Sequence, residues 1–168
     1  MPYVLKLTPL VWYNRCAVSE RQSAWLCVFG RSDFRENYMK LISFVVPCYN
    51  SQAYMKKCID SLLTAGEDAE IIIVNDGSTD ITLKIAKTYR ANFPGIVKVI
   101  DKPNGGHGSG VNAGLKEAEG LYFKVVDSDD WLDTDALRKL LDTIKSHISA
   151  GQSPDLYITN FVYDKPSV

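Results

Sequence analysis

From Leu41 onward, short apolar runs alternate with segments whose apolar residues recur at helical spacing. The apolar runs predict five strands, at residues 41–46, 70–75, 96–100, 121–126 and 156–162. The segments between them predict four helices, near residues 54–63, 83–90, 109–118 and 137–148. Strands that alternate with helices predict an α/β fold, with a mostly parallel sheet flanked by helices. Ligands of such sheets bind at the carboxyl ends of the strands, so we look for function in the loops that follow them.

The composition fits one soluble globular domain with a hydrophobic core. Of the 168 residues, 46% are hydrophobic and 23% are charged. The formal net charge of −1 does not favour electrostatic binding to nucleic acid or to a membrane surface. We therefore expect no nucleic-acid partner.

The cysteines and histidines indicate neither a disulfide framework nor a zinc site. No two cysteines form a CxxC pair, and only two histidines accompany them (Cys16, Cys27, Cys48, Cys58, His107, His147). Without disulfides, a reducing cytosol is the default compartment. No apolar run approaches the roughly 18 residues of a membrane span, and the N-terminus lacks the apolar core of a secretion signal. The sequence therefore predicts a cytoplasmic protein.

Residues 1–38 lack the periodicity of the rest of the chain. They show no sustained spacing, although they contain Trp12 and Trp25, two of the three tryptophans. One interpretation is an extra N-terminal element that packs on the domain. We favour a second interpretation, in which the natural protein starts at Met39, because "MKLISFVV" leads directly into the first strand.

Polar turns follow the first two predicted strands. In "PCYNS", Pro47 is expected to stop the strand, Tyr49 offers a flat ring, and Asn50 and Ser51 can cap the following helix. In "NDGSTD", Asp76 follows the second strand, a glycine permits a sharp turn, and the remaining residues supply helix-capping groups. Taken alone, each turn is typical of an ordinary connection between a strand and a helix.

A glycine-rich segment, "DKPNGGHGSGVNAG", follows the third strand. Glycines let backbone amides approach a ligand, and a helix that starts here can point its positive end at phosphate. Residues 108–113 also fit the GxGxxA pattern of dinucleotide-binding domains, and Asp127 lies 19 residues beyond Gly108. In that pattern the first glycine lies in the turn directly after the strand, whereas seven residues separate Ile100 from Gly108 here. An NAD-binding oxidoreductase therefore remains the less favoured alternative.

The fourth strand ends in a group of carboxylates, in "FKVVDSDDWLD". Asp127 and Asp129 flank one serine, so both side chains point to one side of an extended segment. This arrangement suits a hard divalent cation, which takes one or two protein carboxylates and completes its coordination with phosphate and water. Asp130 and Asp133 instead fit the N-terminus of the following helix, where acidic side chains favour the helix dipole.

Taken together, "VVPCYN", "VNDGSTD", "NGGHGSGVNAG" and "KVVDSDDW" resemble family 2 glycosyltransferases. The resemblance extends from Met39 to about Tyr163, in this order and at these spacings. It implies the nucleotide-sugar-binding half of the GT-A fold, a Rossmann-like parallel sheet flanked by helices. We therefore assign residues 39–168 to this domain, with the acceptor half missing.

The resemblance also implies which residues bind the nucleotide. Pro47 and Tyr49 would line the pocket for the base and the ribose, and Asp76 would accept a hydrogen bond from the uracil edge. Lys102 and Asn104 lie where chains of that family approach the nucleotide.

The resemblance further implies a divalent cation, Mn²⁺ or Mg²⁺. Asp127 would contact the ribose and lie near the metal, and Asp129 would bind the metal where it bridges the diphosphate. One position departs from the family, which often has an arginine where this chain has Val111 before Asn112. A phosphate contact from that position is therefore in doubt, and His107 is a candidate replacement.

The implied activity is metal-dependent transfer of a sugar from a nucleotide-sugar, expected to be a UDP-sugar, to a glycan or other hydroxyl acceptor. Such enzymes usually invert the anomeric centre, with a carboxylate base from the acceptor half. That base is expected to lie after the fifth strand and to be absent from this chain. Membrane association of the intact enzyme and self-association of the chain stay open. A nucleotide-binding module without catalytic activity is a further alternative.

Overall fold

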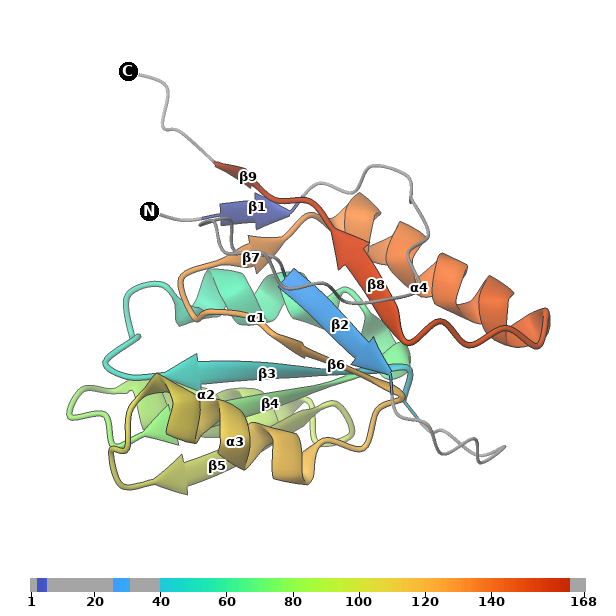
Figure 1. Ribbon diagram of the computed structural model, residues 1–168. Helices are drawn as coiled ribbons and strands as arrows, with labels where there is room; N and C mark the ends of the chain where they lie inside the picture. Colours follow the sequence, from blue (N-terminus) through green and yellow to red (C-terminus); the bar gives the residue numbers. More distant parts are fainter. Residues whose placement is uncertain (1–2, 6–25, 31–39, 164–168) are drawn as a thin grey trace, which may run out of the picture.

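The computed structural model describes residues 3–5, 26–30 and 40–163. At its centre is a six-stranded sheet with the strand order β5-β4-β3-β6-β2-β8 (Figure 1). In chain order its strands are β2 (Leu26–Gly30), β3 (Ile42–Cys48), β4 (Ala69–Asp76), β5 (Val97–Lys102), β6 (Tyr122–Val125) and β8 (Leu156–Thr159). Strands β3 to β6 run parallel, whereas β2 is antiparallel to β6 and β8.

A smaller three-stranded sheet has the order β7-β1-β9. Its strands are β1 (Tyr3–Leu5), β7 (Trp131–Leu132) and β9 (Val162–Tyr163). The four α-helices that the structure describes are α1 (Met55–Leu63), α2 (Thr82–Asn92), α3 (His107–Glu117) and α4 (Thr134–Ser149). A short 3₁₀ helix, η1 (Gly66–Asp68), precedes β4.

Both faces of the central strands are buried. Every residue of β3 and β4 is buried, because successive side chains of a strand point to opposite faces and helices cover both. On one face, Val45, Ile72 and Val74 belong to a small apolar cluster that includes Ala113 of α3 and Ala118 directly after it. On the other, Phe44 and Ile73 belong to a larger core that includes residues of α1, α2 and α4. The predicted α/β fold with a parallel sheet is therefore confirmed.

The first strand continues past the residue that was expected to stop it. Pro47 belongs to β3 and is paired with Val74 of β4. Proline lacks only the N–H donor, so it is tolerated near the end of a strand, where its carbonyl can still accept a hydrogen bond. The strand therefore runs to Cys48, directly before the loop that contains Tyr49.

The side of the sheet beyond β6 differs from the sequence prediction. The expected strand at 156–162 forms two strands, β8 and β9, in different sheets. Strand β8 does not pair with β6, because β2 from the N-terminal extension lies between them (Figure 1). The five residues of β2, "LCVFG", are too short a run to reveal a strand by periodicity. The start of the natural protein at Met39 stays a prediction. Trp12 and Trp25 lie outside the described residues.

The carboxyl ends of the four parallel strands meet at one edge of the sheet, so the loops that follow them lie close together. No helix among the described residues is long and apolar enough to cross a membrane.

Candidate nucleotide-sugar site

Hydrogen bonds connect the loop after β3 to the loop after β4. The Asn50 N–H donates to Ser78 Oγ over 3.0 Å, and the Thr79 N–H donates to Asn50 Oδ1 over 2.9 Å. Next to them, the Ser51 N–H donates to Thr82 Oγ1 over 2.8 Å. Asn50 has a φ of 51°, in the left-handed region that asparagine tolerates better than most residues. The two loops therefore form one connected polar layer.

Of the helix caps that the turn sequences predict, the one for α1 does not form. Helix α1 has no side-chain cap, because Asn50 and Ser51 bond to the neighbouring loop instead. In α2, Asp80 does accept a hydrogen bond from the Thr82 N–H, over 2.9 Å. Asp133 caps α4 as expected and accepts from the Ala136 N–H over 2.9 Å.

Asp76 anchors the glycine-rich loop after β5. Its carboxylate pairs with the Lys102 ammonium and accepts hydrogen bonds from the N–H groups of Gly105, over 3.0 Å, and Gly106, over 2.8 Å. The residue is only 3% exposed. Burial by itself raises the pKa of Asp76, but the hydrogen bonds from Lys102 and the two amides outweigh it and lower the pKa below its ordinary value. Asp76 therefore stays ionised and fixes the loop that leads into α3.

Close approaches of two glycines lie beside two more of the residues predicted to bind the nucleotide, Asn104 and Pro47. Gly77 has a φ of 70°, and a side chain there would place its Cβ 2.6 Å from the backbone nitrogen of Asn104. Pro47 is buried beneath α3, where a Cβ on Gly110 would lie 3.3 Å from its own Cβ. Tyr49 lies outside this packing and is 52% exposed. The structure thus places Asn104 beside the Asp76 turn and leaves the Tyr49 ring open to solvent.

Asp127 and Asp129 are exposed at the turn that follows β6. Asp127 Oδ1 lies 3.9 Å from Nδ1 of His107, the first residue of α3. Among the described residues, no three His, Cys, Asp or Glu side chains lie together as a metal site. Two exposed carboxylates nevertheless fit a cation of the Mg²⁺ type, because such an ion takes one or two protein carboxylates and its other ligands from phosphate and water.

The residue between the two aspartates points into the protein. Ser128 is 9% exposed, and its Oγ lies 2.8 Å from Oγ of Ser51, which is 1% exposed. The Cys58 thiol donates to the Asp127 carbonyl over 3.5 Å. The sequence interpretation did not include these contacts. The sequence pattern could have indicated them, because on an extended segment a serine between two solvent-facing carboxylates points toward the protein interior.

The GxGxxA segment does not lie where dinucleotide-binding domains have it. Gly108 is the second residue of α3, whereas the first glycine of that pattern lies in the turn between strand and helix. Here Gly105 and Gly106 precede the helix, and their amides are bonded to Asp76.

The model of glycosyl transferase family 2 matches residues 43–166, which include all four loops of the site. This chain belongs to glycosyltransferase family 2. The match does not favour the alternative of an NAD-binding oxidoreductase. Among relatives, the hyaluronan synthase of Pasteurella multocida is 41% identical over 110 residues, which are 65% of this chain and 11% of the synthase. The chondroitin synthase of Pasteurella multocida strain Pm70 is 42% identical over 102 residues, 60% of this chain and 10% of that protein.

Solved structures place this family 2 glycosyltransferase in the GT-A fold. It resembles S. aureus TarS 1–349 in complex with UDP-GlcNAc, with a TM-score of 0.57 and 35% identity. The similarity covers 64% of this chain and 32% of TarS 1–349. The chain therefore spans about a third of that structure and about a tenth of the two synthases.

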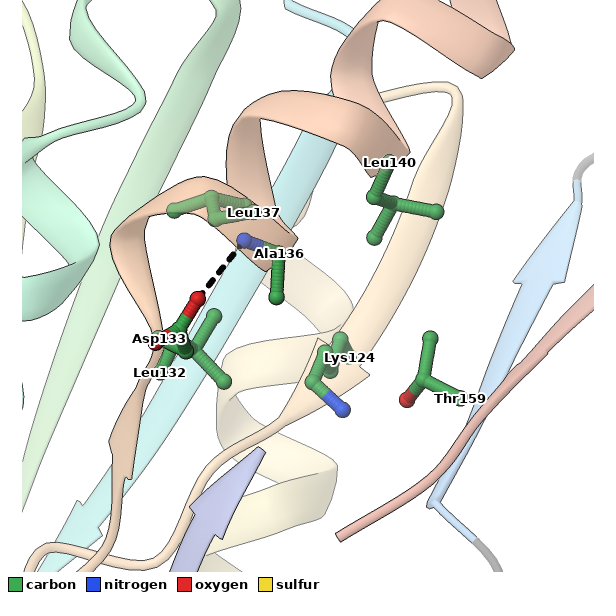
Figure 2. Close-up of a pocket in the computed structure, with 7 residues that line it drawn as sticks. All are labelled: Lys124, Leu132, Asp133, Ala136, Leu137, Leu140 and Thr159. Carbon is green, nitrogen blue, oxygen red and sulfur yellow. Dashed lines mark hydrogen bonds between the residues drawn. The ribbon is translucent and has the colours of Figure 1, made fainter. Parts of the chain in front are cut away.

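A separate pocket of this family 2 glycosyltransferase lies beneath the start of α4 (Figure 2). Leu132, Ala136, Leu137 and Leu140 form its apolar wall. Lys124, Thr159 and Asp133 complete the lining. In Figure 2 the Lys124 ammonium and the Thr159 hydroxyl point toward one another. None of the residues predicted to bind nucleotide or metal lines this pocket, so it is distinct from the candidate site.

Proposed function

We propose that this chain is the donor-binding part of a glycosyltransferase that transfers a sugar from a nucleotide-sugar, a UDP-sugar, to a glycan or other hydroxyl acceptor. The observation that carries the proposal is the meeting of four polar loops, in which Asp127 and Asp129 face solvent beside the N-terminus of α3. The 35% identical structure of TarS with UDP-GlcNAc supports the choice of donor. The family membership makes an enzyme the favoured alternative to a module without catalytic activity.

Asp76 retains the capacity to bind a uracil edge in this proposal. A carboxylate has about four acceptor positions. Oδ1 accepts from Lys102 and Gly105, whereas Oδ2 accepts from only one group of the described residues, the Gly106 N–H. One further position on Oδ2 is thus open to the imide N–H of uracil. The exposed ring of Tyr49 provides a surface on which the base or the ribose packs.

The diphosphate is proposed to lie between the carboxylates and α3. The first amides of this 11-residue helix carry partial positive charge, which favours an anion. Asp129 and Asp127 would hold Mn²⁺ or Mg²⁺, and the bound cation would neutralise the charge that develops on the leaving diphosphate. His107 lies beside Asp127 and is placed to contact the same phosphates.

Transfer with inversion also needs a base that removes the proton of the acceptor hydroxyl while the sugar–oxygen bond to the diphosphate breaks. We propose that this base comes from the acceptor-side part of the enzyme, because the groups assigned here all serve the donor. The relatives are several times longer than the segment that matches. The isolated chain is then expected to bind the donor and to transfer it poorly.

A binding screen tests this proposal. The melting temperature of the chain is measured with UDP-, GDP- and dTDP-sugars, each with and without Mn²⁺, and NADH is included for the alternative function. Stabilisation by a UDP-sugar that depends on Mn²⁺, without stabilisation by NADH, is the expected result. Stabilisation by NADH alone would contradict the proposal.

A transfer assay tests the proposal that the catalytic base lies outside this chain. Positioned acid–base catalysis is worth about 10²–10⁴-fold in rate, and loss of acceptor positioning lowers the rate further. We expect at most slow hydrolysis of the UDP-sugar when the chain is offered a panel of sugar acceptors. Rapid transfer over many turnovers would show that a base is already present in this chain.

A further inference from the structure

The buried contact between Ser51 and Ser128 joins the two halves of the proposed donor site. Ser128 lies between the carboxylates proposed to hold the cation, and Ser51 follows the loop with the exposed Tyr49 ring. The two Oγ atoms are 2.8 Å apart, although 77 residues separate them in the chain. Both residues are buried, and both hydroxyls also share hydrogen bonds with the Cys48 thiol, so the Ser51–Ser128 contact is the link between the two loops in a small buried network.

Ser51 is held in place from several sides. Its N–H donates to Thr82 Oγ1 over 2.8 Å, and its carbonyl accepts from the N–H groups of Tyr54, over 3.2 Å, and Met55, over 3.0 Å. Its hydroxyl also lies 3.4 Å from the Tyr49 carbonyl, to which it can donate. If Ser51 donates to Tyr49, then Ser128 donates to Ser51, and the two contacts form one chain of hydrogen bonds.

The turn with the carboxylates is held from the same side. In addition to the Ser128–Ser51 contact, the Cys58 thiol of α1 donates to the Asp127 carbonyl over 3.5 Å. Within the turn, the Asp130 N–H donates to the same carbonyl over 3.0 Å. The backbone of the turn is therefore attached to the protein interior, whereas the carboxylates of Asp127 and Asp129 face solvent.

We infer that Ser51 and Ser128 are positioning residues that couple the nucleoside loop to the cation-binding carboxylates. This inference rests on the proposed function. A donor that bridges the two loops needs the Tyr49 side and the Asp127–Asp129 side at a fixed separation, and the Ser51–Ser128 hydrogen bond sets that separation before the donor binds. Groups held in place in advance cost less ordering on binding. Mn²⁺ and UDP then strengthen each other's binding more than two loosely connected loops would allow.

The test compares the gain in UDP affinity that Mn²⁺ produces in Ser51→Ala, Ser128→Ala and the double variant. Isothermal titration calorimetry of the full chain with UDP, with and without Mn²⁺, measures this gain. A single buried hydrogen bond contributes enough to make the expected loss of gain about fivefold in each single variant. The double variant should lose no more than either single variant, because both substitutions remove the same contact.

Ser43→Ala is the matched control. Ser43 is also a buried serine with a buried hydrogen bond, 2.5 Å to Glu70 Oε1, but it lies on β3 at the opposite end of the sheet. It should lower the melting temperature and leave the gain from Mn²⁺ unchanged. If an alanine variant does not fold, the cysteine variant, which has nearly the same size and a weaker hydrogen-bonding group, is measured in its place.

The outcomes separate this inference from the proposed function. A wild-type chain that binds no UDP in Mn²⁺ overturns the proposed function. A wild-type chain with a Mn²⁺-dependent gain, but with the same gain in both single variants, overturns the inference alone. The inference would also be overturned if the double variant lost the sum of the two single losses of the Mn²⁺-dependent gain. Such a sum would show that the two serines act independently.

Discussion

The two ends of strand β4 are built alike, yet the glycines that they anchor are buried at one end and exposed at the other. At each end a buried carboxylate pairs with a lysine of β5: Glu70 with Lys98 over 2.8 Å at the amino end, and Asp76 with Lys102 at the carboxyl end. Each carboxylate also accepts two backbone N–H groups from a segment beside α3. These come from Gly105 and Gly106 before the helix, and from Glu119 and Gly120 after it. Strand β4 therefore fixes both ends of helix α3.

The two ends differ in the exposure of the segment whose N–H groups bond to the carboxylate. At the amino end Gly120 is buried, and a Cβ there would lie 2.6 Å from the backbone nitrogen of Ser43, so the chain is closed against β3. At the carboxyl end Gly105 and Gly106 are exposed. The same arrangement of a carboxylate, a lysine and two amides closes the chain against the core at one end and holds an exposed loop at the other, where we propose that the donor binds. Substitutions at the two ends should therefore separate stability from binding.

The largest effect on stability is expected for Glu70→Ala. The change removes the acceptor of the Ser43 hydroxyl and of the Glu119 N–H, and leaves the Gly120 N–H with only the Ser43 hydroxyl as its acceptor. We expect the free energy of unfolding in urea to fall by about 3 kcal/mol. UDP affinity of the folded protein should stay unchanged. A fall in UDP affinity as large as the loss of stability would remove the distinction between the two ends.

The opposite result is expected for Asp129→Asn at the carboxyl end. This carboxylate is exposed and lies near Asp127 and Asp130, so its removal relieves repulsion and should leave stability unchanged or slightly higher. UDP affinity in Mn²⁺ should fall at least tenfold, as is typical when the environment of a metal site is disturbed. Calorimetry on the folded variant measures both quantities. Unchanged Mn²⁺-dependent affinity would exclude Asp129 as a metal ligand.

These anchors also show what the sequence could and could not predict. Apolar periodicity predicted the order of the parallel strands and helices, and the turn residues placed Asp76, Asp127 and Asp129 at one edge of the sheet. The partners of Asp76 were not predicted, because they come from a loop 26 to 30 residues away. The Ser51–Ser128 contact spans 77 residues. Local patterns determine elements, whereas such pairs depend on how distant loops meet.

Strand β2 illustrates the same limit in the fold itself. Its position between β6 and β8 depends on pairing with strands about 90 to 130 residues later in the chain, and its five residues carry no local signal that specifies this. The contacts of Cys58 and Ser128 behind the carboxylates were missed for the same reason.

Low pH should weaken the contacts at both ends of β4 together, because both depend on an ionised carboxylate, Glu70 or Asp76. Burial raises the pKa of each carboxyl group, but hydrogen bonds, from Lys98 and Ser43 to Glu70 and from Lys102 and two amides to Asp76, lower both pKa values overall. A lowered folded-state pKa contributes stability above the unfolded-state pKa, ordinarily 4.5 for Glu and 3.8 for Asp, and that stability is lost as the pH falls through the folded-state pKa.

The melting temperature should therefore fall below about pH 4.5, and less steeply in Glu70→Gln and in Asp76→Asn. Asp76→Asn should in addition weaken UDP binding at neutral pH, whereas Glu70→Gln should not. Melting curves from pH 3 to pH 7 measure the first effect, on the order of 1 kcal/mol for each carboxylate. An unchanged acid profile in both variants would show that neither carboxylate contributes to stability through its ionised form.

The smallest effect is expected for a lysine that packs on the surface beside the carboxylates. Lys57 of α1 places its ammonium 3.0 Å from the ring centroid of Trp131. Trp131 follows directly after the Asp127–Asp130 turn. Unlike Lys98 and Lys102, Lys57 has an aromatic face and not a buried carboxylate as its partner. Cation–π contacts at exposed sites contribute about 0.5–1 kcal/mol. Lys57→Gln should therefore lower the free energy of unfolding by about 0.5 kcal/mol, with little change in UDP affinity.

Lys56→Gln, at the neighbouring exposed position, controls for the loss of one positive charge and should have no such effect. Equal effects of the two substitutions would show that net charge, and not the contact with Trp131, is responsible.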